Sequence, residues 1–224
     1  MTVASADLTA AFGLIFDHPE GTDWYWGDAA DRIEEKLPYT DPDSFNVIEA
    51  ALDQLPDLAG RYSAWQIATG FEYLFNNVLS SYPFLFQDER IEEARRVSTV
   101  GKLFSLFDTV FRHAAAWTHG PAHQQRDLTA GPQGYVNIVC YMFWDNCPLA
   151  DLGIPAIRSA CIDVMERCLG IPNNAVIESA LHGLGHLAPS DKRAAGLAAG
   201  FADRGIGHPA LITYARAASA GYVQ

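Results

Sequence analysis

The sequence predicts an all-α fold, a single domain of stacked antiparallel helices. Apolar residues recur at spacings of three and four, and almost no stretch alternates apolar and polar residues as a half-buried strand does. One segment carries a complete helix start, with Ser63 as N-cap, Gln66 closing a capping box, and an apolar stripe from Ile67 to Val78. Hydrophobic residues make up 49% of the chain and charged residues 19%, which predicts a large buried interior or an apolar surface kept for a partner.

In the N-terminal half, each expected helix lies between start and stop signals. The run 18–21 ends the first helix, and Pro42 opens the third, which the run 56–60 closes. Residues 98–101 leave open a division of the last segment into two helices, and 118–134 is the longest expected loop. The expected helices span 4–16, 28–37, 41–55, 63–78 and 88–117.

The C-terminal half has a regular rhythm, with helix starts about every 16 to 20 residues and therefore two helices per repeat of about 35 to 40 residues. The segment 157–169 followed by 176–187 resembles HEAT-like and armadillo-like helical repeats, and the resemblance covers 135–224. It implies a right-handed superhelix, HEAT-like in architecture, whose faces bind other macromolecules. One domain over 1–224 is the prediction, and a subdivision into 1–118 and 135–224 stays open. The expected helices span 135–144, 155–169, 174–187, 191–203 and 209–218.

The net charge of −12 and the short apolar runs argue against several classes of function. An acidic surface repels nucleic acid and attracts a basic partner. The uncharged run 128–144 falls short of the roughly 20 apolar residues of a membrane helix, so no membrane span is predicted. The first basic residue is Arg32, so the N-terminus lacks the charged region of a secretory signal and we expect a cytoplasmic protein. The sequence has no phosphate-loop, dinucleotide or serine-nucleophile motif, and no cofactor is predicted.

The sharpest chemical candidate is the series Glu178, His182 and His186, which lies along one flank of an expected helix. Two histidines four residues apart can chelate a transition metal. The segment differs from the H-E-x-x-H motif of zinc proteases, because no glutamate is placed to act as a base. Gly183 and Gly185 instead indicate close approach of a neighbouring helix, with the histidines hydrogen-bonded at its margin. We predict the structural role, and the metal site is the alternative.

A second group of histidines brackets the long loop: His113, His119 and His123, with Asp127 after them. Three histidines within eleven positions could gather around an ion, and long loops often carry function. Their irregular spacing predicts no ligand geometry, so a solvated loop is the prediction.

The four cysteines form two pairs of equal spacing, Cys140 with Cys147 and Cys161 with Cys168. Seven helical residues rise about 10.5 Å, which is too far for one zinc ion or one disulfide to join either pair. We therefore expect buried, reduced thiols, and a zinc site built from two neighbouring helices remains the alternative.

Two clusters of aromatic and acidic residues, 24–28 and 141–145, are candidate partner surfaces. Tryptophan and tyrosine are favoured at binding hot spots, although they are equally useful in a core. Three consecutive aromatic residues cannot all face one side of a helix, so at least one in the first cluster should be exposed. The candidate partner-binding residues are Trp24, Tyr25, Trp26, Asp28, Trp144 and Asp145.

These observations predict a non-enzymatic, acidic helical-repeat protein that binds another protein, with a basic partner favoured by charge. The first alternative is a metal-dependent enzyme that uses Glu178, His182 and His186, or the histidines of the 113–123 segment. The second alternative is a structural subunit of a homo-oligomer.

Overall fold

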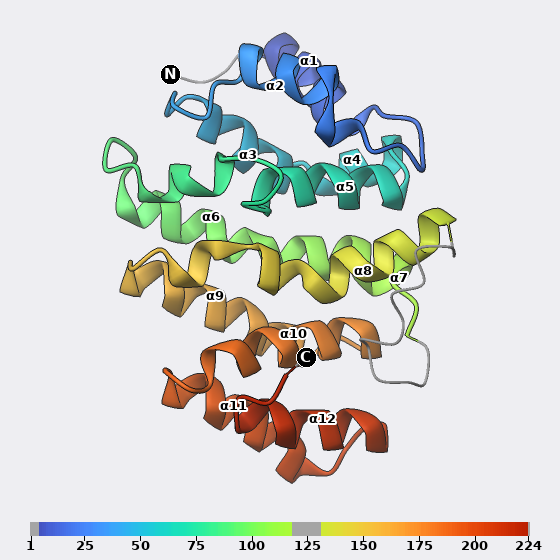
Figure 1. The fold of residues 1–224 in the computed structure, drawn as a ribbon, viewed down its shortest axis with the longest axis vertical. Coiled ribbons are helices and arrows are strands. Elements are labelled where there is room, and N and C mark those ends of the chain that lie inside the picture. Colours follow the sequence, from blue (N-terminus) through green and yellow to red (C-terminus); the bar gives the residue numbers. More distant parts are fainter. Residues whose placement is uncertain (1–4, 118–130, 224) are drawn as a thin grey trace.

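The computed structural model of the chain describes residues 5–117 and 131–223, which form an all-α protein of twelve helices (Figure 1). The helices follow one another in layers along the long axis, from α1 at one end to α12 at the other. The bounds are α1 Ser5–Phe16, α2 Asp28–Lys36, α3 Ser44–Asp53, α4 Leu55–Arg61, α5 Ala64–Phe75, α6 Glu93–Leu106, α7 Arg112–Ala114, α8 Gly131–Asn146, α9 Pro155–Cys168, α10 Asn174–Leu187, α11 Lys192–Arg204 and α12 Pro209–Ser219. Short 3-10 segments lie at Trp24–Trp26, Tyr82–Gln87 and Pro148–Asp151, and a π turn follows α6 at Phe107–Phe111. Within residues 5–117 and 131–223, no helix is both long enough and apolar enough to cross a membrane.

Helix α5 begins as predicted and ends earlier than predicted. The Ser63 hydroxyl accepts the backbone N–H of Gln66 at 3.2 Å, and the Gln66 side chain accepts the N–H of Ser63 at 3.0 Å, which confirms the capping box. The helix ends at Phe75, and Val78 is exposed instead of lying on the buried stripe. The reason is Asn76, which is extended and whose side chain accepts the N–H of Val78 at 2.8 Å, forming a local turn that competes with the helix.

Two other expected boundaries are wrong, and the division left open at residues 98–101 is absent. The run 56–60, expected to close a helix, lies inside α4, where proline occupies one of the first two positions and costs no hydrogen bond. Helix α6 passes through residues 98–101 without a break. Residues 131–134, expected in the loop, form the first turn of α8, and the remainder of that expected loop, 118–130, lies outside the described residues.

The predicted core is confirmed. All four cysteines are free and buried, as expected for small apolar side chains. The apolar periodicity also places a set of residues on inward stripes, and every one of them is buried: Phe71, Leu74, Phe107, Val110, Cys161, Val164, Leu181 and Leu184. The three-and-four spacing therefore identified the inner faces of the helices correctly.

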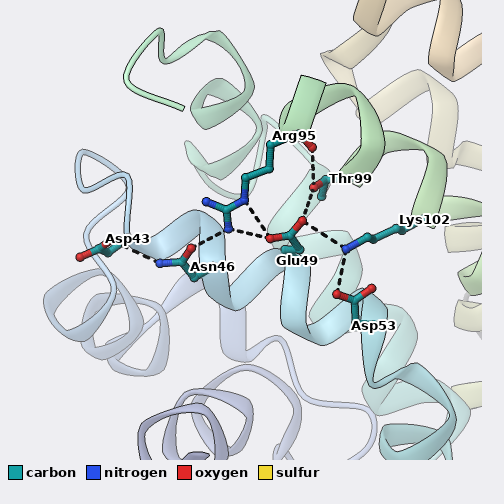
Figure 2. A network of polar contacts seen from close by, with 7 residues as sticks. All are labelled: Asp43, Asn46, Glu49, Asp53, Arg95, Thr99 and Lys102. Carbon is teal, nitrogen blue, oxygen red and sulfur yellow. Dashed lines mark hydrogen bonds and ion pairs between the residues drawn. The ribbon is translucent and has the colours of Figure 1, made fainter. Parts of the chain in front are cut away.

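A network of charges centred on Glu49 joins α3 to α6 (Figure 2). Its carboxylate contacts the Arg95 guanidinium at 2.6 Å and the Lys102 ammonium at 3.1 Å, and it accepts the Thr99 hydroxyl at 3.2 Å. Lys102 also contacts Asp53 at 2.8 Å. Partial burial opposes ionisation of Glu49, but the hydrogen bonds from the two cations outweigh it and lower the pKa of the carboxyl. Glu49, Asp53, Arg95 and Lys102 thus each have a partner of opposite sign.

Candidate metal centre

Helix α10 is the central helix of the C-terminal half, because it packs against α8, α9, α11 and α12. Its N-cap is Asn173, whose side-chain oxygen accepts the backbone N–H of Ala175 at 2.8 Å. Neighbours on several sides bury most of its residues, including the polar Glu178, Ser179 and His182. Buried polar groups on such a helix require partners from the surrounding helices.

Gly183 allows α8 to lie close against α10. A Cβ atom at this position would lie 2.7 Å from Cγ and 2.8 Å from Cβ of Trp144, distances at which something would have to move. Trp144 is followed by Asp145, and Gly183 stands next to His182. The close approach predicted from the glycines is therefore present, and it brings the Asp145 carboxylate to the histidines.

Asp145, His182 and His186 each place a potential ligand atom within 4.8 Å of the other two. The Asp145 carboxylate lies 3.1 Å from Nε2 of His182 and 2.5 Å from Nε2 of His186. The two Nε2 atoms are 3.1 Å apart. Four ligands at about 2.0–2.1 Å around a tetrahedral zinc ion lie about 3.3 Å from one another. The contact between His182 and Oδ2 of Asp145 and the distance between the two Nε2 atoms, both 3.1 Å, are near this value. The 2.5 Å between His186 and Oδ1 of Asp145 is a hydrogen-bond distance, so binding of an ion requires these two groups to move apart.

The charges of this cluster favour a cation at its centre. Both imidazole Nε2 atoms face the same carboxylate and each other, so protons on both would point two N–H donors at one another. Partial burial opposes ionisation of Asp145, but hydrogen bonds from the two histidines outweigh it and lower the pKa of its carboxyl. The hydrogen bond to Asp145 in turn raises the pKa of His186. A divalent ion would supply the positive charge without this crowding of protons.

The cluster is closed on the His182 side and open on the His186 side. The exposed fractions of the side chains are 1% for His182, 21% for Asp145 and 45% for His186. Water and small molecules can therefore reach the cluster past His186. Three protein ligands with one accessible side are typical of catalytic metal sites, whereas structural sites use four protein ligands.

Two tyrosines support His182 from behind. Nδ1 of His182 lies 2.6 Å from the Tyr214 hydroxyl of α12, and that hydroxyl lies 3.1 Å from the Tyr141 hydroxyl of α8. The Tyr141 ring also packs on the imidazole, with ring centres 4.4 Å apart. Metal-binding histidines commonly donate a hydrogen bond from the N–H of the second ring nitrogen to an oxygen acceptor, which fixes the orientation of the ring.

Glu178, expected as the third member of the metal alternative, lies outside the cluster. Its carboxylate accepts the indole N–H of Trp117 at 3.1 Å. Burial raises the pKa of Glu178 to about 7, and the single hydrogen bond from Trp117 offsets this only in part. Asp145 takes the place that the sequence suggested for Glu178. In the parts of the chain that the structure describes, no other group of three histidine, cysteine or acidic side chains converges in this way.

The second histidine group is mostly beyond the described residues. His113 is exposed on α7. His119, His123 and Asp127 lie outside the described residues, so the expectation for that loop stays a prediction.

Most of the expected partner-binding aromatic residues are buried. Trp24, Tyr25 and Trp144 belong to the core, whereas Trp26 is 62% exposed, which confirms that the first cluster has an exposed member. Asp28 is exposed at the start of α2.

The sequence does not indicate that Asp145 contacts the two histidines or that Tyr214 contacts His182. The aromatic and acidic pattern places Asp145 on a candidate partner surface, and no sequence pattern marks Tyr214. The usable signal was the glycine spacing beside His182, which indicated a close helix contact but not the helix that makes it.

Comparison of the chain with known protein families, with curated proteins and with solved structures finds no match.

Proposed function

We propose that Asp145, His182 and His186 bind one divalent transition-metal ion. The observation that carries this proposal is that both imidazole Nε2 atoms contact the one Asp145 carboxylate, at 3.1 Å and 2.5 Å, and lie 3.1 Å from each other. Imidazole and carboxylate ligands suit Zn(II) and Fe(II), and two histidines with one carboxylate leave coordination positions free on either ion.

We further propose that this ion serves a metal-dependent enzyme. The support is the accessible side of the cluster beside His186, where a bound water or a substrate oxygen would complete the coordination. This proposal favours the enzymatic alternative over a purely structural role for the histidines.

Metal analysis of purified protein tests the metal proposal. We expect one zinc or iron per chain in the wild type and loss of the metal in the His182→Ala, His186→Ala double variant. Asp145→Asn should also lose it, whereas Glu178→Gln, four positions before His182 on the same helix, should keep it. A metal that depends on Glu178 and not on Asp145 would contradict the proposed ligand set.

We propose a basic protein partner at Trp26 as a second function. The support is the exposed indole beside the exposed carboxylates Asp28 and Asp31 in the first turn of α2, on a chain with a net charge of −12.

Kinetics with a partner isolated from the native cell test the proposal of a Trp26 surface. Raising the salt from about 0.05 M to about 0.5 M should slow association more than it changes dissociation, since it screens long-range attraction. Trp26→Ala should weaken the binding free energy by about 2 kcal/mol through faster dissociation. Tyr222→Ala, a control at another exposed aromatic residue, should leave dissociation unchanged. Wild-type affinity in Trp26→Ala would place the interface elsewhere.

The HEAT-like superhelix over 135–224 and the cytoplasmic location also stand as proposals. Support for the first comes from α9 to α12, which have 14, 14, 13 and 11 residues and pack against their neighbours in sequence. The proposal of a cytoplasmic location rests on the sequence alone.

A further inference from the structure

We propose that Tyr214 is a positioning residue for the metal centre: its hydroxyl accepts the Nδ1 proton of His182 when Nε2 of that imidazole binds the ion. The inference rests on the proposed metal function. It is drawn from the 2.6 Å contact between Nδ1 and the Tyr214 oxygen, on the side of the ring opposite to Asp145 and His186.

His182 has to place its proton on Nδ1 to bind a metal through Nε2. A neutral imidazole carries one N–H, and a metal takes the nitrogen that lacks it. The side chain of His182 is 1% exposed, so an N–H at Nδ1 cannot rely on bulk water for an acceptor. The Tyr214 hydroxyl is the group within hydrogen-bond distance of that nitrogen.

The pairing of Tyr214 with Tyr141 lets the Tyr214 hydroxyl act either as acceptor from Nδ1 of His182 or as donor to it. With Nε2 on the metal, the Nδ1–H donates to the Tyr214 oxygen, and the Tyr214 proton turns to the Tyr141 oxygen at 3.1 Å. With the proton on Nε2, Tyr141 donates to Tyr214 and Tyr214 donates to Nδ1. No proton is lost in either arrangement, and each of the three polar atoms keeps its partner. A tyrosine hydroxyl can both accept and donate a hydrogen bond.

Tight packing of the C-terminal end holds Tyr214 in place. A Cβ atom on Gly185 would lie 3.2 Å from Cα of Ala218 in α12 and would collide with the side chain of Val223. The last described residues therefore lie against α10 at Gly185, and the C-terminal end of the ribbon returns to α10 in Figure 1. Helix α12 thus contributes to the centre without supplying a ligand.

Zn(II) binding to Tyr214→Phe tests the inference by competition with a chromophoric chelator. We expect the dissociation constant for Zn(II) to rise about 10- to 100-fold, the usual effect of removing a hydrogen-bond partner of a ligand histidine. Tyr135→Phe is the matched control, because Tyr135 also pairs with a tyrosine, Tyr25 at 2.7 Å, but stands apart from the cluster. Its affinity for Zn(II) should stay at the wild-type value.

Nitrogen NMR of the wild-type protein supplies a readout that does not depend on comparing the Zn(II) affinities of variants. In the Zn(II)-loaded protein, long-range proton–nitrogen spectra should show the His182 proton on Nδ1, with the resonance assigned from His182→Gln. Equal Zn(II) affinity in Tyr214→Phe and Tyr135→Phe would overturn this inference alone. A proton on Nε2 of His182 in the loaded protein would overturn it together with the assignment of His182 as a ligand. Wild-type protein that binds no Zn(II) would overturn the metal proposal with it.

Discussion

Glu49 and Asp145 are each held by two nitrogen groups, and their geometry is nearly the same. The Glu49 carboxylate has contacts of 2.6 and 3.1 Å to Arg95 and Lys102, and the Asp145 carboxylate has contacts of 2.5 and 3.1 Å to His186 and His182. The exposed fractions of the two carboxylate side chains are also close, 20% and 21%. Distance and burial therefore do not tell a stabilising network from a binding site.

The chemistry of the nitrogen groups makes the difference. Guanidinium and ammonium groups are charged at neutral pH and have no lone pair to offer a metal, so the Glu49 network is complete as it stands (Figure 2). Imidazoles carry a lone pair in their neutral form, and two of them facing one carboxylate form a site that a cation completes. The first arrangement ties α3 to α6, and the second can hold an ion between α8 and α10.

The largest expected effect is stabilisation of the fold by Zn(II). A ligand at 1,000 times its dissociation constant stabilises the native state by about 4 kcal/mol, because it binds the folded chain alone. Thermal unfolding with and without Zn(II) should show this shift in the wild type and lose it in Asp145→Asn. Glu49→Gln should lower the stability without Zn(II) by about 1 kcal/mol and keep the Zn(II) shift. A Zn(II) shift that survives in Asp145→Asn would end the distinction between the two carboxylates.

A third carboxylate, Glu72, has no cationic partner among the described residues and sharpens the comparison. Burial raises its pKa to about 7, although the Tyr135 hydroxyl donates to it at 2.9 Å. The folded state therefore binds a proton that the unfolded state releases, and stability should fall as the pH rises from about 4.5 to about 7. Urea unfolding should show Glu72→Gln more stable than the wild type by about 3 kcal/mol at pH 8, with the difference vanishing near pH 4. A constant difference across this range would show that Glu72 has an ordinary pKa.

The smallest of these effects concerns the packing that positions Tyr214. Gly185→Leu should destabilise the fold by about 1 to 3 kcal/mol, in spite of the better helix propensity of leucine, since α12 and Val223 occupy the space. Gly196→Ala in α11 is the control, because a Cβ there meets nothing within 4 Å. It should raise the stability by up to about 1 kcal/mol. A thermal unfolding temperature that rises in Gly185→Leu would contradict the close contact.

Local signals predicted the helices, but not the site. The capping box at Ser63 and the apolar stripe of α10 involve residues within a few positions of one another, so the sequence alone was sufficient for them. The end of α5 was mispredicted because the Asn76 turn competes with a continuing apolar pattern. Asp145 meets the histidines only through the packing of α8 on α10, and helical periodicity does not say which helices become neighbours.

X-ray absorption at the zinc edge of the Zn(II)-loaded protein tests the central claim most directly, namely that two imidazoles and one carboxylate form the metal centre. The structure predicts one zinc per chain with nitrogen and oxygen ligands at about 2.0–2.1 Å, the multiple-scattering pattern of two imidazoles, and no sulfur. The same spectrum from the His182→Ala, His186→Ala double variant should show no bound zinc. Zinc–sulfur distances of about 2.3 Å would place the metal at the cysteines instead and contradict the assignment.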